Sequence, residues 1–203
     1  MLFDDTYLTI ATATEGQFSD RGSKFLAFAF PVNMENDLKA ILNRLKNEHP
    51  KANHHCWAMR LSPDRSVFRV NDDGEPAGTA GRPILNTLLS RDLTNIVVVV
   101  VRYFGGTLLG VPGLINAYKT AAENALGNAA VIEKTVDDVC TVEFDYVKMN
   151  DVMKVIKDDN LAILKQASDN TCSIQIAVRK TLVNKVISKL ENAGAKVRYN
   201  YSG

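Results

Sequence analysis

Apolar and polar residues follow different patterns in the two parts of this chain of 203 residues. In residues 24–30 and 95–102 the apolar side chains are almost continuous, which indicates strands covered on both faces. From about residue 135 onward apolar and polar side chains alternate, as in residues 172–179, which is typical of strands with one face in water. This change predicts two domains, residues 1–134 and residues 135–203.

The N-terminal domain is predicted to mix strands and helices. Leu38, Ile41 and Leu45 recur at helical spacing, so residues 34–48 should form an amphipathic helix that covers one face of a sheet. The five consecutive valines of residues 97–101 favour the innermost strand, because branched side chains suit an extended backbone. Other elements are expected as strands at 7–14, 24–30, 54–61 and 66–70 and as helices that begin at Pro83 and Pro112.

The C-terminal domain is predicted to have the element order β-α-β-β-α-β. Val142 and Phe144 alternate with polar neighbours, and two intervening stretches carry apolar residues at i, i+3, i+4 and i+7. This order is the ferredoxin-like pattern, in which both helices lie on one side of a four-stranded antiparallel sheet. The predicted fold class is therefore α+β.

Composition narrows the function classes. Lys and Arg total 24 against 23 Asp and Glu, so the chain has no overall positive field that would draw it onto nucleic acid or an anionic membrane. The chain begins with acidic residues, and no apolar run is long enough for a signal peptide or a membrane span. Three widely spaced cysteines fit reduced thiols, so we expect a cytoplasmic protein that does not interact with membranes.

Two glycine-rich segments, residues 72–83 and 102–113, each lead into a predicted helix. The first amides of a helix lack internal partners and carry the positive end of its dipole, so such a segment can hold an anion. Arg82 and Arg102 add bidentate donors that suit phosphate. If the two segments meet, they form one composite site. The alternative is that the glycines only satisfy turn geometry and that the arginines pair with the neighbouring carboxylates.

The acidic loop formed by Asp72, Asp73 and Glu75 has three interpretations. Its carboxylates can hold Mg²⁺, accept hydrogen bonds from ribose or bases, or brace the nearby cations, and we prefer the last. No cofactor is predicted, and Mg²⁺ is the ion that the loop would take. Neither segment matches a P-loop or a dinucleotide fingerprint, so ATP and NAD binding are not supported.

His54, His55 and Cys56 suggest a metal site or a nucleophile. Because adjacent residues of a strand point to opposite faces, at most one histidine shares a face with Cys56. We therefore do not expect a catalytic Cys–His pair. We expect His55, or else His54, to line a pocket beside the glycine-rich segments.

Several ordered motifs together resemble the IMPACT/YigZ family: Ser23-Lys24-Phe25, His54-His-Cys-Trp57, Asp72-Asp-Gly-Glu-Pro-Ala-Gly-Thr-Ala-Gly-Arg-Pro83 and Arg102-Tyr-Phe-Gly-Gly106 with Leu109-Gly110, Gly113-Leu114 and Ala117-Tyr118. The sequence departs from the family pattern at Val111-Pro112, where small residues are usual. The resemblance is to the bacterial two-domain YigZ type. It implies a βαβ-type N-terminal domain similar to the second domain of a small-subunit ribosomal protein, and a C-terminal domain similar to domains of elongation factor G.

The resemblance also implies a translation-linked role, since eukaryotic IMPACT proteins restrain a stress-activated kinase of translation initiation. We therefore expect a non-enzymatic protein that binds RNA or the ribosome and modulates translation. The alternatives are a metal-assisted hydrolase or binder of small phosphorylated ligands, and a protein-interaction module whose partner belongs to the translation machinery. The ligand-binding residues are expected to be Lys24, His55, Gly78, Thr79, Gly81, Arg82, Arg102, Tyr103, Gly105 and Gly106, with Tyr103 or Trp57 available for stacking.

Overall fold

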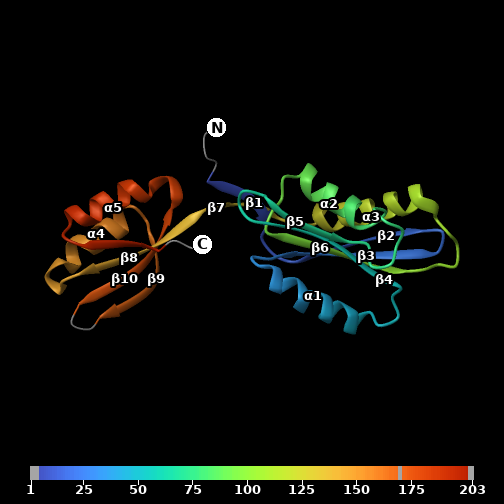
Figure 1. Cartoon of the computed structure of the whole chain (residues 1–203), viewed down its shortest axis with the longest axis horizontal. Coiled ribbons are helices and arrows are strands. Elements are labelled where there is room, and N and C mark those ends of the chain that lie inside the picture. Colours follow the sequence, from blue (N-terminus) through green and yellow to red (C-terminus); the bar gives the residue numbers. More distant parts are fainter. Residues whose placement is uncertain (1–4, 169–170, 201–203) are drawn as a thin grey trace. The chain divides into compact units, whose positions relative to one another are not determined.

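A computed structural model describes residues 5–168 and 171–200 of the chain. The chain folds into two compact units of mixed α and β structure (Figure 1). Residues 7–134 form the N-terminal unit, and residues 135–203 together with residues 1–6 form the C-terminal unit. None of the helices within the described ranges is long and apolar enough to cross a membrane.

The N-terminal unit is built on a five-stranded sheet in which all neighbouring strands are antiparallel. The strands lie in the order β2-β3-β6-β4-β5. Their bounds are Thr14–Asp20 for β2, Ser23–Pro31 for β3, His54–Leu61 for β4, Val67–Asn71 for β5 and Ile96–Tyr103 for β6. The valine-rich strand β6 is thus the central strand, as predicted.

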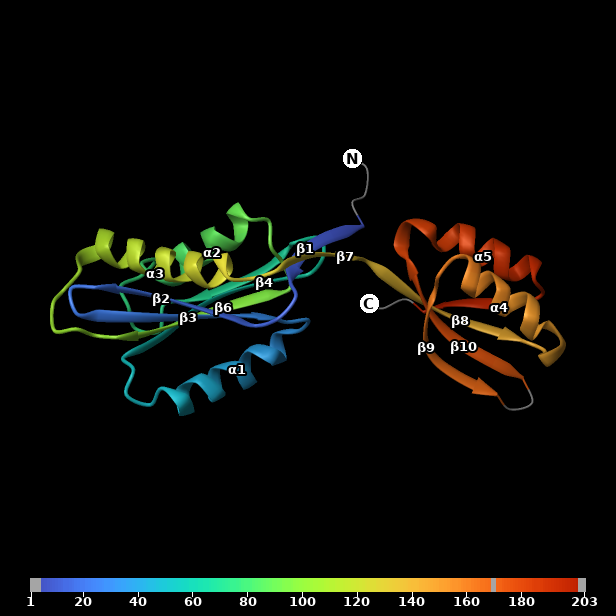
Figure 2. The ribbon, with the colours of Figure 1, turned by 180° about the vertical axis from the view of Figure 1, so that it is seen from behind.

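The valine run of β6 serves two cores, which explains why it does not alternate. Val97, Val99 and Val101 face helix α1 (Glu35–Glu48), whose Leu38 and Leu45 belong to the same apolar cluster. The intervening valines, Val98 and Val100, face the other side with α2 (Gly81–Ser90) and α3 (Gly110–Gly127). Figures 1 and 2 show α1 alone on one face of the sheet and α2 with α3 on the opposite face.

The two helices predicted to begin at Pro83 and Pro112 each begin two residues earlier in the structure. The sequence places Pro83 and Pro112 first in their helices, whereas α2 begins at Gly81 and α3 at Gly110. Proline is tolerated there because the amides of the first helical turn lack intrahelical acceptors, so the missing N–H costs no hydrogen bond.

The strand predicted at residues 7–14 is shorter in the structure: it ends at Ile10, and Thr14 is the first residue of the next strand, β2. β1 (Thr6–Ile10) pairs with β7 (Val131–Thr135) in a separate two-stranded sheet. β2 is an edge strand with the sequence TEGQFSD. Its many polar residues explain why the apolar pattern does not predict it.

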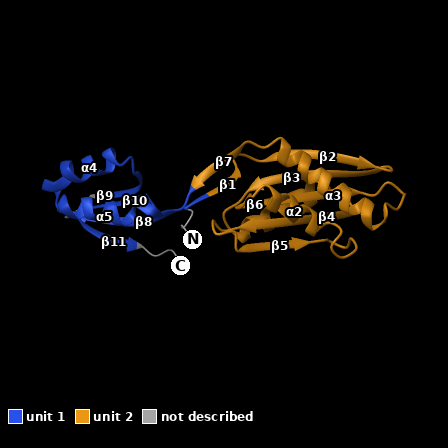
Figure 3. Ribbon diagram, turned by 90° about the horizontal axis from the view of Figure 1, so that it is seen from above, with its two compact units in different colours: residues 1–6, 135–203 blue, residues 7–134 orange. Residues whose placement is uncertain are grey.

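The C-terminal unit is a four-stranded antiparallel sheet in the order β11-β8-β10-β9 (Figure 3). Cys140, Val142 and Ile174 pack under the helices in a core of their own. The elements are β8 (Asp137–Phe144), η1 (Tyr146–Lys148), α4 (Met149–Asp158), β9 (Ala162–Ser168), β10 (Cys172–Arg179), η2 (Lys180–Leu182), α5 (Val183–Asn192) and β11 (Lys196–Asn200).

The sequence boundary assigns Asp5 to the first domain, but the structure groups it with the C-terminal unit. Its carboxylate accepts two hydrogen bonds from Arg179, each of 2.7 Å, and a third from the hydroxyl of Thr181. These hydrogen bonds hold the pKa of the Asp5 carboxyl well below its usual range. An ion pair between distant parts of a sequence leaves no local signal that a boundary prediction can use.

Candidate functional site

The two glycine-rich segments meet at a cleft of about 420 Å³ in the N-terminal unit. Most of its walls are apolar, and a few polar groups lie among them. We call this hollow the cleft; it is lined by Asn53, His54, Glu75, Pro76, Arg102, Phe104, Leu108, Leu109, Gly110, Val111 and Leu114. The side chain of Leu108 is 82% exposed, so the rim of the cleft presents apolar surface to solvent.

A buried ion pair joins the two segments at the cleft. Nη1 of Arg102, at the end of β6, donates to Oε1 of Glu75 at 2.5 Å. The hydroxyl of Tyr118, on α3, donates to the same oxygen at 2.7 Å. Arg102 is 5% exposed and Glu75 is 9% exposed, so each charge depends on the other for compensation. This pairing ties the acidic loop to β6 and α3.

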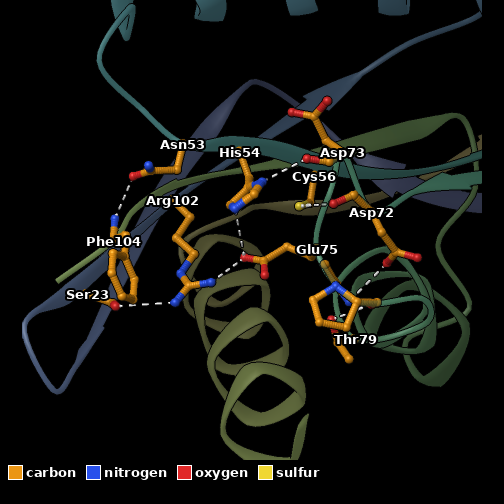
Figure 4. Close-up of polar contacts among 12 residues, drawn as sticks. Ser23, Asn53, His54, Cys56, Asp72, Asp73, Glu75, Thr79, Arg102 and Phe104 are labelled. Carbon is orange, nitrogen blue, oxygen red and sulfur yellow. Dashed lines mark hydrogen bonds and ion pairs between the residues drawn. The ribbon is translucent and has the colours of Figure 1, made fainter. Parts of the chain in front are cut away.

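The Arg102 guanidinium is held by aromatic rings as well as by Glu75. Its central carbon lies 5.3 Å from the ring centre of Phe25 and 5.5 Å from that of Phe104. Nη2 reaches the hydroxyl of Ser23 at 3.5 Å, while Nε has no hydrogen-bond partner among the described residues. Figure 4 shows Arg102 and His54 converging on Glu75.

His54 and Cys56 share the face of the sheet that carries Arg102, as the register of β4 with β6 requires. Nδ1 of His54 donates to the carbonyl oxygen of Asp73 at 2.8 Å, and Nε2 lies 3.9 Å from Oε1 of Glu75. Burial raises the pKa of the Cys56 thiol and that of the Tyr118 hydroxyl. Cys56 is therefore a neutral, buried thiol, which is a poor nucleophile.

The acidic loop binds backbone amides of its own chain. Asp72 accepts from the amides of Gly78 at 2.8 Å, Ala80 at 3.1 Å and Gly81 at 2.8 Å. Asp73 accepts from the amide of His55 at 2.6 Å. The start of α2, which the sequence offers as an anion site, thus already holds a carboxylate. No group of three or more His, Cys, Asp or Glu side chains in residues 5–168 and 171–200 is arranged to hold a metal ion.

The start of α3 has the opposite arrangement. Leu109 has a right-handed helical conformation and Gly110 follows with φ of 72°, a sequence that turns successive amides into a concave anion-binding nest. In the described part of the chain, no group accepts a hydrogen bond from the amides of Leu109, Gly110 or Val111. All three residues line the cleft.

The structure distributes the other predicted ligand residues over several surfaces. Arg82 and Gly78 line a separate groove of about 540 Å³ between α2 and α3, with Lys119. Lys24 and Tyr103 face each other across β3 and β6, on the α1 side of the sheet. They are therefore on the face opposite to Arg102, and the predicted residues do not form a single phosphate site.

His55 is also on the α1 side, because it alternates with His54 and Cys56 along β4. Burial lowers the pKa of its side chain. The histidine at the cleft is His54 instead. Strand alternation predicts that the two histidines separate, but it does not say which face will carry the cleft.

Thr79 and Gly105 have structural roles. The hydroxyl of Thr79 donates to the carbonyl of Pro76 at 2.7 Å. A Cβ on Gly105 would lie 1.9 Å from the carbonyl carbon of Gly22, so only glycine fits this close approach of two chain segments. Gly106 has φ of 85° and open space beside it. None of the three lines the cleft.

The predicted ligand residues do not include Ser23, Asn53 or Tyr118, although Ser23 and Tyr118 lie in the family motifs, and His54 is the predicted alternative to His55. Tyr118 falls on the apolar side of its predicted helix, and a buried tyrosine hydroxyl needs a hydrogen-bond partner. That requirement is a usable signal for a buried polar site. Asn53 accepts from the Phe104 amide at 2.8 Å, a contact between residues 51 positions apart that leaves no local pattern.

Comparison with known proteins identifies the family. The profile of the Impact N-terminal domain matches residues 21–126, which include both glycine-rich segments and the whole cleft. The chain belongs to the IMPACT family. A relative from Haemophilus influenzae, described as an IMPACT family member, is 31% identical over 186 residues, which cover 91% of this chain and 90% of the relative.

Two further comparisons extend over most of the chain. The IMPACT family member YigZ of Escherichia coli is 31% identical over 170 residues, 83% of either chain. A crystal structure described as that of a hypothetical protein is 27% identical, with a TM-score of 0.76, and covers 99% of this chain and 100% of its own. The IMPACT likeness inferred from the motifs is thus confirmed, and the two-unit architecture is shared with a solved structure.

Proposed function

We propose that this IMPACT-family protein acts by binding, and that it modulates translation by holding a protein of the translation machinery at the cleft. The observation that carries the proposal is the cleft itself, where the two glycine-rich segments meet and the rim exposes apolar side chains. Such a hollow with a few placed polar groups is the usual form of a recognition site.

Binding is favoured over catalysis because the chemically active groups of the cleft are already paired. Glu75 is held by Arg102 and Tyr118, and Asp72 and Asp73 accept backbone amides. A hydrolase would need at least one carboxylate that is available as an acid, a base or a metal ligand. These pairs support the interpretation that the acidic loop braces the site.

A protein partner is favoured by the chemistry of the rim. Phe104, Leu108 and Val111 are exposed apolar side chains around the cleft, and apolar anchors in a pocket are what protein interfaces use. The link to translation comes from the family resemblance. We also propose that the C-terminal unit has the ferredoxin-like fold, because its strand order and its β-α-β-β-α-β sequence fit that pattern. The likeness of the N-terminal unit to a ribosomal protein domain is part of the same proposal.

RNA binding is a second candidate, and the groove between α2 and α3 favours it. Arg82 and Lys119 line this groove with Asn86, Ser90 and Glu123. Because Lys119 pairs with Glu123 at 3.7 Å, Arg82 is the cation on which contact with a phosphate backbone would depend. If RNA binds there, filter binding across a salt series should show a steep salt dependence. Arg82→Ala should reduce that slope, and a flat response would remove this candidate.

The proposal is tested by cosedimentation of the full chain with ribosomal particles in sucrose gradients. Leu108→Ser removes an exposed rim side chain, so we expect it to release the protein from the particles. Phe68→Ser is the matched control, since Phe68 is an exposed apolar residue of β5 away from the cleft. Equal cosedimentation of wild type and Leu108→Ser, or equal loss in both variants, would contradict the proposal.

A further inference from the structure

We propose that a second hollow of the N-terminal unit, beside β2, is the docking site for an amphipathic helix of a partner protein, with Lys and Arg side chains flanking the apolar face of that helix. This surface is separate from the cleft and goes beyond the proposed function. Two observations carry the inference: α1 covers only part of its face of the sheet, and the walls of the hollow carry negative charge.

The hollow has a volume of about 920 Å³ and shares no residue with the cleft. We call it the β2 hollow. It is lined by residues of β2 and β3 and by the last turns of α1 and α3. It is therefore large enough for several side chains of a partner and lies away from the glycine-rich segments.

The sheet is covered unequally on its two faces. α2 and α3 together cover one face, whereas α1 alone covers the other and packs over β4 and β6 (Figures 1 and 2). Leu26 and Phe28 of β3 point to the α1 side and line the β2 hollow. Because a sheet face is usually covered by helices, a helix placed beside α1 would complete this side of the sheet.

The edge of β2 is already covered by α3. Nδ2 of Asn124 donates to the carbonyl oxygen of Gln17 at 2.9 Å, and Nδ2 of Asn128 donates to that of Glu15 at 2.8 Å. An added strand would need these carbonyls of the edge for its own ladder. A partner at the β2 hollow is therefore expected to bind through side chains, as a helix on a sheet face does.

The walls of the β2 hollow are acidic. Glu15, Glu48 and Glu123 line it, and no Lys or Arg does. Glu15 has no ion-pair partner in residues 5–168 and 171–200. Glu48 and Glu123 each pair with a cation on their own helix, at 3.5 Å and 3.7 Å, but their side chains are 50% and 42% exposed. Such exposed pairs contribute little, so these carboxylates are available to a partner's cations.

Charge complementarity selects the partner. Apolar side chains packed on Leu26 and Phe28 gain from burial, and Lys or Arg side chains beside them meet the carboxylates of the walls. A helix with apolar anchors at i, i+3, i+4 and i+7 presents both kinds of group on one side. The same three carboxylates repel a phosphate backbone, so RNA does not fit this surface.

The test uses the full chain and a fluorescein-labelled peptide, Leu-Lys-Lys-Leu-Leu-Lys-Ala-Leu-Lys-Lys-Leu-Leu-Lys-Ala. Fluorescence polarisation should show that this Lys peptide binds at least about tenfold more tightly than the same peptide with Gln in place of Lys. A peptide of the same composition whose leucines do not form one helical face should also bind at least about tenfold more weakly. Equal binding of the three peptides, or no binding of the Lys peptide, would overturn the inference.

Two double variants locate the binding surface. Glu15→Gln with Glu48→Gln removes two charges from the β2 hollow and should weaken binding of the Lys peptide by at least about tenfold. Glu133→Gln with Glu35→Gln is the matched control, because both residues are exposed carboxylates outside the hollow and Glu35 pairs with an arginine as Glu48 does. The control should bind like wild type. Equal loss in the two double variants would contradict binding at the hollow.

Competition separates other ligands and other surfaces. Displacement of the Lys peptide by spermidine at the peptide's own concentration would assign the hollow to small polyamines and overturn the inference. Loss of peptide binding in Leu108→Ser would place the peptide in the cleft and would also overturn it. If the Lys and Gln peptides bind equally while Leu108→Ser still releases the protein from ribosomal particles, the proposed function stands and this inference falls.

Discussion

The starts of α2 and α3 look alike in sequence and differ in chemistry. Ala80-Gly-Arg-Pro83 and Leu109-Gly-Val-Pro112 place glycine and proline at the same helical positions. At α2, the Asp72 carboxylate accepts from three amides, whereas at α3 no described group accepts from the nest. A glycine-rich helix start is therefore a binding site only where the chain itself does not supply the acceptor.

The difference also explains the acidic loop. Asp72 fills the anion position of α2, and Glu75 reaches across to Arg102 and Tyr118 beside α3. The start of α2 is closed, because the Asp72 carboxylate accepts hydrogen bonds from its amides. The start of α3 is open, because no described group accepts from its first amides, and it lies beside a cleft in which Arg102 and Glu75 balance each other's charge. The acidic residues shape the site without occupying its open part.

The largest expected effect comes from breaking the link between the two regions. Glu75→Ala leaves Arg102 buried without a counter-charge and should lower the free energy of unfolding of the N-terminal unit by about 3–5 kcal/mol. Urea unfolding followed by fluorescence of Trp57, the single tryptophan of the chain, reports on this unit.

Glu35→Ala is the matched control for Glu75→Ala. Glu35 also pairs with an arginine, Arg69, at 3.0 Å, but both side chains are largely exposed. Removal of an exposed partner should cost about 0–1 kcal/mol. If Glu75→Ala costs no more than Glu35→Ala, the buried pair does not organise the cleft.

The next effect tests the closed helix start directly. Asp72→Ala removes an acceptor from three amides at and before α2 and should cost about 2 kcal/mol, from lost capping and charge-assisted hydrogen bonds. Asp72→Asn keeps one of the two acceptor oxygens, one of which serves Gly78 and the other Ala80 and Gly81, and should cost about half as much. The same Trp57 unfolding assay measures both, and an unchanged midpoint for Asp72→Ala would show that α2 does not depend on this cap.

Alkaline pH should weaken the N-terminal unit through the groups behind the cleft. The pKa values of Cys56 and Tyr118 are raised above their ordinary 9.0 and 10.0 by burial. Above about pH 9 the unfolded chain loses these protons and the folded chain keeps them, so the free energy of unfolding should fall with rising pH. The slope is at most about 1.4 kcal/mol per pH unit for each group.

Cys56→Ala provides the control for the pH dependence. It removes the group with the lower ordinary pKa, so the fall in stability should begin nearer pH 10 than pH 9. Urea unfolding at pH values from about 7 to 10.5 gives the profile. The same profile for both proteins would mean that the thiol does not stay protonated in the fold.

The smallest effect is expected from a substitution that gives the start of α3 a carboxylate, as Asp72 does for the start of α2. Val111→Asp gives α3 a carboxylate in its first turn and should raise stability by about 0.3–1 kcal/mol, because Val111 is exposed and the helix dipole favours the charge. Val111→Asn should raise it less. A loss of stability with Val111→Asp, and none with Val111→Asn, would indicate that the start of α3 does not carry an open positive end.

Much of the fold is predictable from the apolar pattern, because strand and helix periods are local. The valine run predicts the central strand. The change from continuous to alternating apolar residues near residue 135 predicts two domains. The contacts that decide the site are not local. Asp72 reaches amides six to nine residues ahead, and Asn53 reaches Phe104. Sequence spacing alone does not show which distant backbone groups such side chains contact.

The candidate site was predicted in part for the same reason. The meeting of the two glycine-rich segments follows from placing both before helices on one sheet, and Arg102 and Glu75 are indeed together. Alternation separates His54 from His55, but only the packing of α2 and α3 decides that the His54 side carries the cleft. Arg82 does not line the cleft, because it lies on the side of α2 that borders the groove between α2 and α3.

The central claim is that the start of α2 is closed by Asp72 and the start of α3 is open. Amide hydrogen exchange of the free protein, resolved by NMR, tests it directly. The amides of Gly78, Ala80 and Gly81 should exchange slowly, and those of Gly110 and Val111 should exchange fast. Slow exchange at Gly110 and Val111 in the absence of any ligand would contradict the account, because it would reveal an acceptor within the chain.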